Sequence, residues 1–277
     1  MRKCYRIVTI VLVAGVLGVF SWMAVRSREP VYQGKALSVW LDQYCTNHES
    51  QPGSDLDKDA ETAIRHFGTN AIPTYLHMIT DKGSPLTLQL IAHTSSKWRN
   101  RLHIPDLSDY QLQLDDRRVL GAVGIAALGD EAKPAIPILI GLLHETNEWV
   151  RIAAATALGS LGPAAHDAVP ALMTCLNDPD AGVRLSAASG LGQIHQNSEQ
   201  VIPILIKQAE GRDENTRWAA VESLGQFGAQ AKPAVPILVG LLNDSDEMMR
   251  LMATDALRNI DPEAAEKAGV RLLRKPE

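Results

Sequence analysis

The side chains of this chain best suited to metal chemistry are histidine and glutamate, which stand next to each other at two places. These pairs are His48-Glu49 and His144-Glu145, and imidazole and carboxylate groups together bind zinc or iron in many enzymes. The other histidines are scattered, and the chain has no H-E-x-x-H, G-x-S-x-G, phosphate-loop or C-x-x-C motif. The sequence therefore predicts no catalytic residue, no metal-ligand set and no bound cofactor.

Arginine is the second candidate for chemistry because it recurs every 33 residues. A row of guanidinium groups at such an interval can bind anions or form ion pairs. Four polar residues stand four positions before an arginine of the row, where each can cap a helix and meet an arginine of its own or the adjacent repeat. We interpret the set as a structural ladder rather than an anion site, and it comprises Asn147, Arg151, Asp180, Arg184, Asp213, Arg217, Asp246 and Arg250, with Arg118 one interval earlier.

The elements that position these arginines repeat with the same period. Two complete units read RIAAATALGSLGPAAHDAVPALMTCLND (151–178) and RWAAVESLGQFGAQAKPAVPILVGLLND (217–244). An alanine-rich run with apolar residues at helical spacing ends at Gly162 or Gly228, where glycine can take the left-handed conformation. A second amphipathic run follows, with a proline in its first turn. The pattern predicts an all-α superhelix whose apolar faces are buried only when neighbouring units stack.

These units resemble HEAT repeats, and more closely the short bacterial HEAT-like repeats named after phycobilisome lyases. The resemblance is carried by a V-R-x-x-A-A-x-A-L-G-x-L-G first helix and a P-A-x-P-x-L-x-x-L-L-x-D second helix. It covers 115–260 strongly and 59–80 weakly. It implies an armadillo-like α-α superhelix that binds proteins, with an enzyme of the bilin-lyase or di-iron-hydroxylase type as the alternative. The hydroxylases hold iron with several His-Glu pairs, whereas this chain has two, and one precedes the repeats.

The N-terminal region contains 19 consecutive uncharged residues, 7–25, preceded by Arg2, Lys3 and Arg6. Their length as a helix nearly matches a hydrocarbon core of about 30 Å. The excess of positive charge on the N-terminal side predicts a signal anchor with 1–6 in the cytoplasm and the repeats outside the cytoplasmic membrane. A cleaved signal peptide, which would leave a secreted or periplasmic protein, is the alternative.

The charge and cysteine content restrict the partners and the covalent chemistry. Without the three cations that precede the apolar run, 24 Lys and Arg face 32 Asp and Glu. An acidic protein without a basic stripe is a poor nucleic-acid binder, so we expect neither nucleic acid nor a small-molecule substrate. Cys175 shares its repeat position with Leu142 and Leu241, which indicates a packed apolar residue, and no structural disulfide is expected.

The remaining segments are interpreted as caps, an insertion and a partner-binding surface. We expect a linker and capping helix in 26–55, and a solenoid in 56–273 that ends in a helix over 263–273. The capping helix is expected to start at Gly34 and to carry Leu37, Trp40, Leu41 and Tyr44 on one apolar face. An irregular insertion, 81–114, loses the period after one helix over 84–95. Second helices usually line the concave face of such arrays. On these grounds the expected contacts with a protein partner of unknown identity are Trp98, Arg101, Trp149, Thr174 and Lys207.

Overall fold

The computed structural model describes residues 29–50, 55–94 and 105–270, with the side chains of 47–50 and 55–57 left out of the description. The chain divides into two compact units between Thr74 and Tyr75. In the part of the chain that is described, no helix has the length and apolar character needed to cross a membrane. The apolar run 7–25 and the N-terminal tail 1–6 lie outside the described residues.

The first unit begins with a small β-hairpin that the sequence did not predict. Strands β1 (Val31–Tyr32) and β2 (Lys35–Ala36) are antiparallel, and Tyr32 pairs with Lys35. Gln33 and Gly34 between them have φ of 48° and 76°, as a tight two-residue turn with left-handed residues requires. The capping helix α2 (Leu37–Ser50) therefore starts after this hairpin and not at Gly34.

Helix α2 packs against α3 (Asp55–Phe67), which is followed by the 3-10 turn η1 (Gly68–Ala71). Three of the four residues predicted to share the apolar face of α2, Leu37, Trp40 and Leu41, are at most 4% exposed. The Trp40 indole N–H donates to the Tyr32 carbonyl oxygen at 3.1 Å, so the hairpin is tied to the helix. The predicted face is thus the buried face of this unit.

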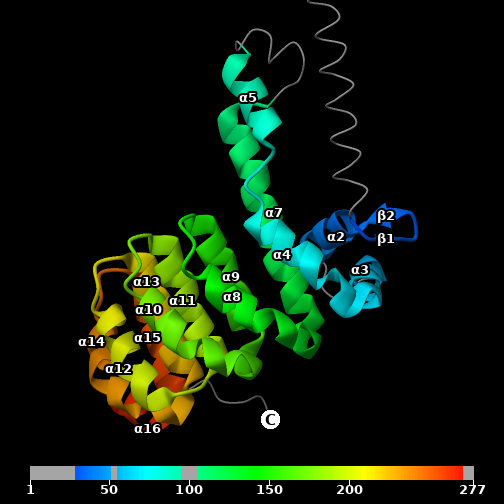
Figure 1. Cartoon of the computed structure of the whole chain (residues 1–277). Coiled ribbons are helices and arrows are strands. Elements are labelled where there is room, and N and C mark those ends of the chain that lie inside the picture. The colour runs from blue at the N-terminus through cyan, green and yellow to red at the C-terminus, as the bar shows by residue number, and fades with distance from the viewer. Residues whose placement is uncertain (1–28, 51–54, 95–104, 271–277) are drawn as a thin grey trace, which may run out of the picture. The chain divides into compact units, whose positions relative to one another are not determined.

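The second unit contains the repeats (Figure 1). Each repeat has a first helix, a turn and a shorter second helix. The predicted proline lies in the first turn of α8, α10 and α14, whereas Pro203 lies inside α12, which begins earlier. The elements are α4 (Ile72–Thr80), α5 (Pro85–His93), α7 (Leu107–Leu128), η2 (Gly129–Ala135), α8 (Ile136–Leu142), α9 (Glu148–Ser160), η3 (Gly162–Ala168), α10 (Val169–Cys175), α11 (Ala181–Ile194), α12 (Ser198–Ala209), α13 (Glu214–Gln226), η4 (Gly228–Ala234), α14 (Val235–Leu241), α15 (Glu247–Ile260) and α16 (Pro262–Lys267).

Glycines end the first helices as predicted, because Gly162 and Gly228 have φ of 57° and 52°. His195 occupies the same position of its repeat and also takes a left-handed conformation, with φ of 54°. Its ring stacks on Phe227 of the next repeat at 4.8 Å between centroids. Cys175 is 6% exposed, like its counterparts Leu142 and Leu241 at 9%, which confirms its role as a packed residue.

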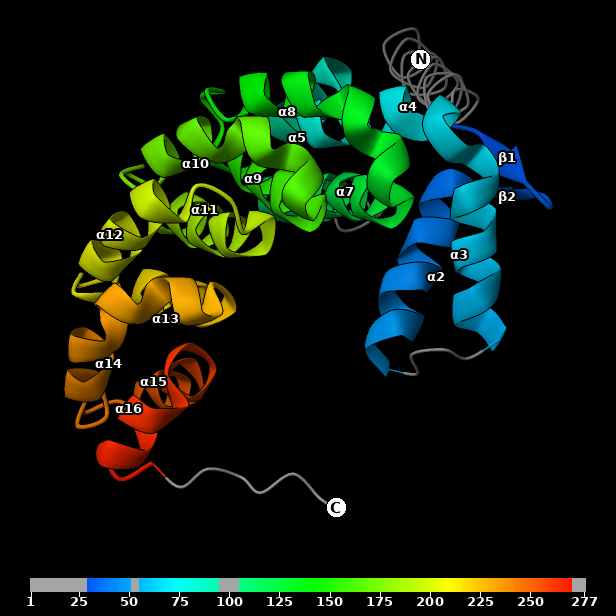
Figure 2. The same ribbon diagram turned by 90° about the horizontal axis from the view of Figure 1, so that it is seen from below.

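The first helices form one row and the second helices another, and the two rows follow an arc (Figure 2). The row of α8, α10, α12 and α14, called the outer row below, lies outside the row of α9, α11, α13 and α15, called the inner row. The expectation that second helices line the concave side was therefore wrong. Small residues explain the difference: a Cβ on Gly159 would lie 2.7 Å from the Gly190 Cα, so first helices approach each other closely.

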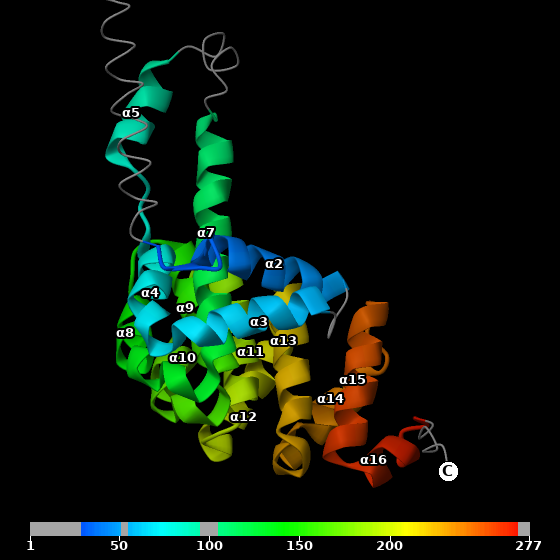
Figure 3. The ribbon, with the colours of Figure 1, turned by 90° about the vertical axis from the view of Figure 1, so that its right-hand side faces the viewer.

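The insertion is more regular than predicted. Ser84 caps α5, and its hydroxyl accepts a hydrogen bond from the Thr87 N–H. Residues 107–114, expected to be irregular, form the first two turns of α7, capped by Asp106. Figure 3 shows α5 and this end of α7 extending beyond the other repeat helices. At the other terminus, α16 ends at Lys267, earlier than predicted, because Gly269 turns the chain with φ of 83°.

Candidate functional site

The four polar residues of the predicted ladder are all helix caps. A side-chain oxygen of each accepts a hydrogen bond from a backbone N–H in the first turn of the helix that follows. The accepting residues and their donors are Asn147 from Val150, Asp180 from Val183, Asp213 from Thr216 and Asp246 from Met248. These residues therefore define where each first helix begins.

The repeat arginines close the loops that lead into the first helices. Arg151 Nη1 donates to the carbonyl oxygens of Glu145 and Thr146 at 2.8 and 3.1 Å. Arg184 and Arg250 also donate from Nη1 to two carbonyl oxygens, those of the residues six and five positions earlier in the chain. Because each of these three guanidinium groups satisfies two loop carbonyls, it holds the turn between consecutive repeats in one conformation. Arg217 instead donates to the Ala209 carbonyl oxygen.

The other edge of the guanidinium reaches an acid in the loop that ends the same repeat. Arg151 and Asp178 form a two-point contact, with Nε–Oδ2 at 2.9 Å and Nη2–Oδ1 at 2.8 Å. Arg217 Nη2 donates to Asp244 Oδ2 at 2.6 Å, and both side chains are less than a fifth exposed. The arginines thus link consecutive inter-repeat loops into a ladder along the array.

The acids of this ladder differ from those predicted in two of three cases. Asp178 and Asp244 stand 27 residues after their arginines, whereas the predicted Asp180 and Asp246 stand two residues later and cap helices. For Arg184, the repeat position that corresponds to Asp178 and Asp244 is occupied by Gly211, which has no side chain. Arg184 therefore lies nearest to Asp213, at 3.5 Å, which is the predicted partner. The final Asp of the P-A-x-P-x-L-x-x-L-L-x-D motif was the sequence signal that could have identified Asp178 and Asp244 as the partners of the arginines.

The ladder lowers the pKa values of its acids. Burial alone would raise the pKa of Asp178, but hydrogen bonds from Arg151 and from the Asp180 N–H bring that pKa below its ordinary value. For Asp244 the hydrogen bond from the Asp246 N–H is the main cause of a lowered pKa, followed by Arg217. The pKa of Asp213 is also lowered, by Thr216 and Arg184 acting against burial.

These lowered pKa values predict that acid weakens the array. A carboxyl group with a lower pKa in the folded state stabilises the protein above its unfolded pKa of about 3.9. That stabilisation is lost as the pH falls through the folded pKa, because the unfolded chain binds more protons in this window. We expect the urea midpoint to fall between about pH 4 and pH 2. The urea midpoint of the Asp178→Asn variant should fall less over the same pH interval. Identical pH profiles of the variant and the wild type would contradict a stabilising role for the Asp178 carboxylate.

The structure places Trp149 on a different row of helices from Thr174 and Lys207. Trp98 and Arg101 lie outside the described residues, so their role stays a prediction. Trp149 is on the inner row in α9 and is 40% exposed. Thr174 and Lys207 are exposed on the outer row, in α10 and α12, where we had expected the concave face.

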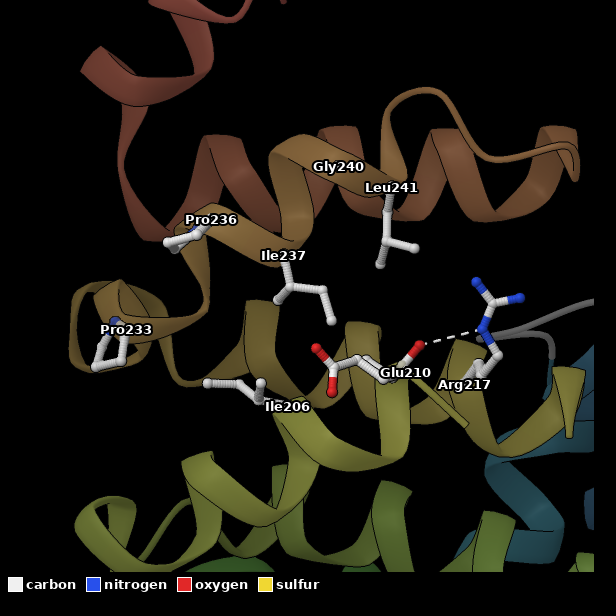
Figure 4. Close-up of a pocket in the computed structure, with 9 residues that line it drawn as sticks. Ile206, Glu210, Arg217, Pro233, Pro236, Ile237, Gly240 and Leu241 are labelled. Atoms are coloured by element: carbon white, nitrogen blue, oxygen red, sulfur yellow. Dashed lines mark hydrogen bonds between the residues drawn. The ribbon is translucent and has the colours of Figure 1, made fainter. Parts of the chain in front are cut away.

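An open groove of about 650 Å³ lies between α12 and α14 on the outer row (Figure 4). Ile237 and Leu241 point from α14 toward α12, and Gly240 adds no side chain there. At one end Arg217 Nε donates to the Ala209 carbonyl oxygen at 3.1 Å, so this guanidinium is already engaged. The groove combines apolar walls with one exposed carboxylate, Glu210, which suits an apolar side chain of a partner better than a reaction.

Of the two candidate metal pairs, His144-Glu145 is the one whose side chains the structure describes. His144 is exposed at the end of the outer-row helix α8, and Glu145 follows it in the loop. The side chains of His48 and Glu49 fall outside the description. Among the residues whose side chains are described, no three His, Cys, Asp or Glu groups are placed to share a metal ion.

Comparisons with known proteins concern the repeats. A family model described as HEAT repeats matches residues 104–192, 135–224, 169–258 and 202–275. A solved engineered protein is 19% identical over 84% of this chain and 97% of its own, with a TM-score of 0.46. The Pds5–Scc1 complex is 13% identical, covering 87% of this chain and 38% of the matched one (TM-score 0.43). A chain of the CpcE–CpcF complex of phycocyanin lyase from Nostoc sp. PCC7120 is 20% identical, covering 87% of this chain and 96% of the matched one, with a TM-score of 0.35. None of the curated proteins matches the chain.

Proposed function

Because the chain belongs to the HEAT-repeat family, we propose that it is a non-enzymatic scaffold that binds another protein on its repeat array. The observation that carries this proposal is the exposure of large apolar side chains on the inner row. Trp149, Met248 and Leu251 are 40%, 52% and 55% exposed. Exposed apolar groups on a repeat surface, tryptophan above all, are typical of protein-binding sites.

The ladder supports the same proposal in a different way. The arginine contacts hold consecutive loops together, so exposed side chains of different repeats keep their spacing. A partner that binds a surface already in place loses less entropy on binding than one that must order it. The array therefore offers an extended, pre-organised surface.

Affinity capture tests the scaffold function. The full-length chain, isolated from its native membrane after brief cross-linking, should enrich one or a few proteins in near-stoichiometric amounts. An unrelated single-pass protein with the same tag serves as the control bait. Enrichment no greater than that of the control, or turnover of a small molecule by the purified chain, would count against the proposal.

We propose in addition that residues 7–25 anchor the protein in the cytoplasmic membrane with the repeats outside. The support is the uncharged run itself and the cations Arg2, Lys3 and Arg6 before it. Carbonate extraction should leave the chain in the membrane, and external protease should degrade a C-terminal tag in intact spheroplasts. A soluble product whose mass lacks the N-terminal run would instead identify a cleaved signal peptide.

A further inference from the structure

Helix α7 and each inner-row helix carry an apolar side chain at one repeat position that is exposed or half-buried. The position falls one residue after each repeat arginine, and its occupants are called the apolar stripe. Val119 and Leu251 at its ends are 51% and 55% exposed, and the three members between them are half-buried. In chain order the stripe consists of Val119, Ile152, Leu185, Trp218 and Leu251.

The stripe is continuous because its helices are consecutive neighbours, from α7 through α9, α11 and α13 to α15. A Cβ on Gly182 would lie 2.8 Å from Ile152 Cδ1, so Ile152 extends over the start of α11. The Trp218 indole N–H donates to Asp246 Oδ2 at 2.7 Å, which directs the ring toward α15. With neighbouring axes about 8–10 Å apart, the stripe spans about 36 Å, the length of a helix of about 24 residues.

Carboxylates border the stripe on both sides. On helices, residues four apart are surface neighbours, and Glu148, Glu214 and Glu247 each stand four before a stripe residue and are exposed. On the other side, Glu222 and Asp255 stand four after Trp218 and Leu251 and are exposed as well. Asp255 is paired with Arg258 at 2.8 Å. Exposed carboxylates therefore border the stripe on α9, α13 and α15.

We propose that the apolar stripe binds a basic amphipathic segment of a partner protein, an inference that rests on the proposed scaffold function. Apolar side chains of the segment would cover the stripe, and its lysine or arginine residues would meet the bordering carboxylates. Charge complementarity selects this occupant. A second copy of the stripe would bring its own carboxylates against these, and an anionic lipid surface would be repelled by them.

Designed peptides of about 24 residues test the inference, the length being that of the stripe. One has leucine on one helical face and lysine along its borders, a second has glutamate in place of lysine, and a third is a scramble of the first. The receptor is the full-length protein in nanodiscs of zwitterionic lipid. The lysine peptide should bind, and its affinity should fall as salt rises, whereas the other two should bind about tenfold or more weakly. Equal binding of the lysine and glutamate peptides, or no binding of either, overturns the inference.

Variants locate the binding site. The double variant Val119→Ala/Leu251→Ala should weaken binding of the lysine peptide about tenfold, and Glu214→Lys/Glu222→Lys should weaken it while reducing its salt dependence. The matched control is Ile138→Ala/Val239→Ala, which removes two exposed apolar side chains, 51% and 36% exposed, from the outer row. Equal affinity in the stripe and control variants overturns the inference, as does self-association of the chain that the stripe variants abolish.

The outcome for the stripe can be told apart from the outcome for the scaffold. If a captured partner is recovered equally by wild type and by Val119→Ala/Leu251→Ala, the scaffold function holds and the stripe is rejected. If capture yields no partner, the scaffold function itself is rejected.

Discussion

Replacing Asp115 with alanine should lower the free energy of unfolding by about 3–5 kcal/mol, the usual cost of leaving one member of a buried ion pair without the other. Asp115 and Arg118 are 8% and 2% exposed and are paired with each other. The second contact of Arg118, from Nη2 to the Asp81 carbonyl oxygen at 2.7 Å, cannot neutralise the guanidinium. Urea denaturation followed by circular dichroism measures the loss.

The neighbouring residue provides the control for this prediction. Asp116 has the same side chain on the same helix but is exposed, so Asp116→Ala should change the free energy of unfolding by no more than about 0.5 kcal/mol. The double variant Asp115→Leu/Arg118→Met, which removes both charges and puts apolar side chains in their place, should recover much of the loss. Equal effects of Asp115→Ala and Asp116→Ala would show that the ion pair between Asp115 and Arg118 does not stabilise the fold.

The second large effect is expected at Leu158, which is fully buried in α9. Leu158→Ala removes apolar contacts and opens a cavity between helices that cannot close completely, which costs about 2–5 kcal/mol. The measurement is again the free energy of unfolding in urea.

Leu251→Ala makes the same chemical change at a position that is 55% exposed. It should cost less than about 1 kcal/mol, because little apolar area leaves the protein interior. A negligible shift for Leu158→Ala, or equal shifts for the two variants, would mean that Leu158 is not a core residue of the array.

Features that depend on a few neighbouring residues were predictable from the sequence. The 33-residue period, the caps at Asn147, Asp180, Asp213 and Asp246, and the left-handed ends at Gly162 and Gly228 each follow from local backbone chemistry. The hairpin at Gln33 was missed because two-residue strands carry almost no periodic signal. The two added turns of α7 were missed because the polar residues in LSDYQLQL obscure a helical period.

The ladder shows where local reasoning stops. The spacing placed a polar cap residue near each arginine of the predicted ladder, but two candidate acids, such as Asp178 and Asp180, stand two residues apart. Both can reach the loop, and only the packed array shows that one binds the arginine and the other caps a helix. The choice depends on the direction of each side chain between two repeats.

By itself the sequence determined the repeat, the class of fold and the buried positions, because these follow from the period of apolar residues and from glycine and proline chemistry. Only the tertiary structure decided which helices lie inside the arc, and hence which exposed residues share a surface. That outcome depends on how closely helices from different repeats approach, as at Gly159 and Gly190, and a distance between separate repeats is not encoded in any one of them.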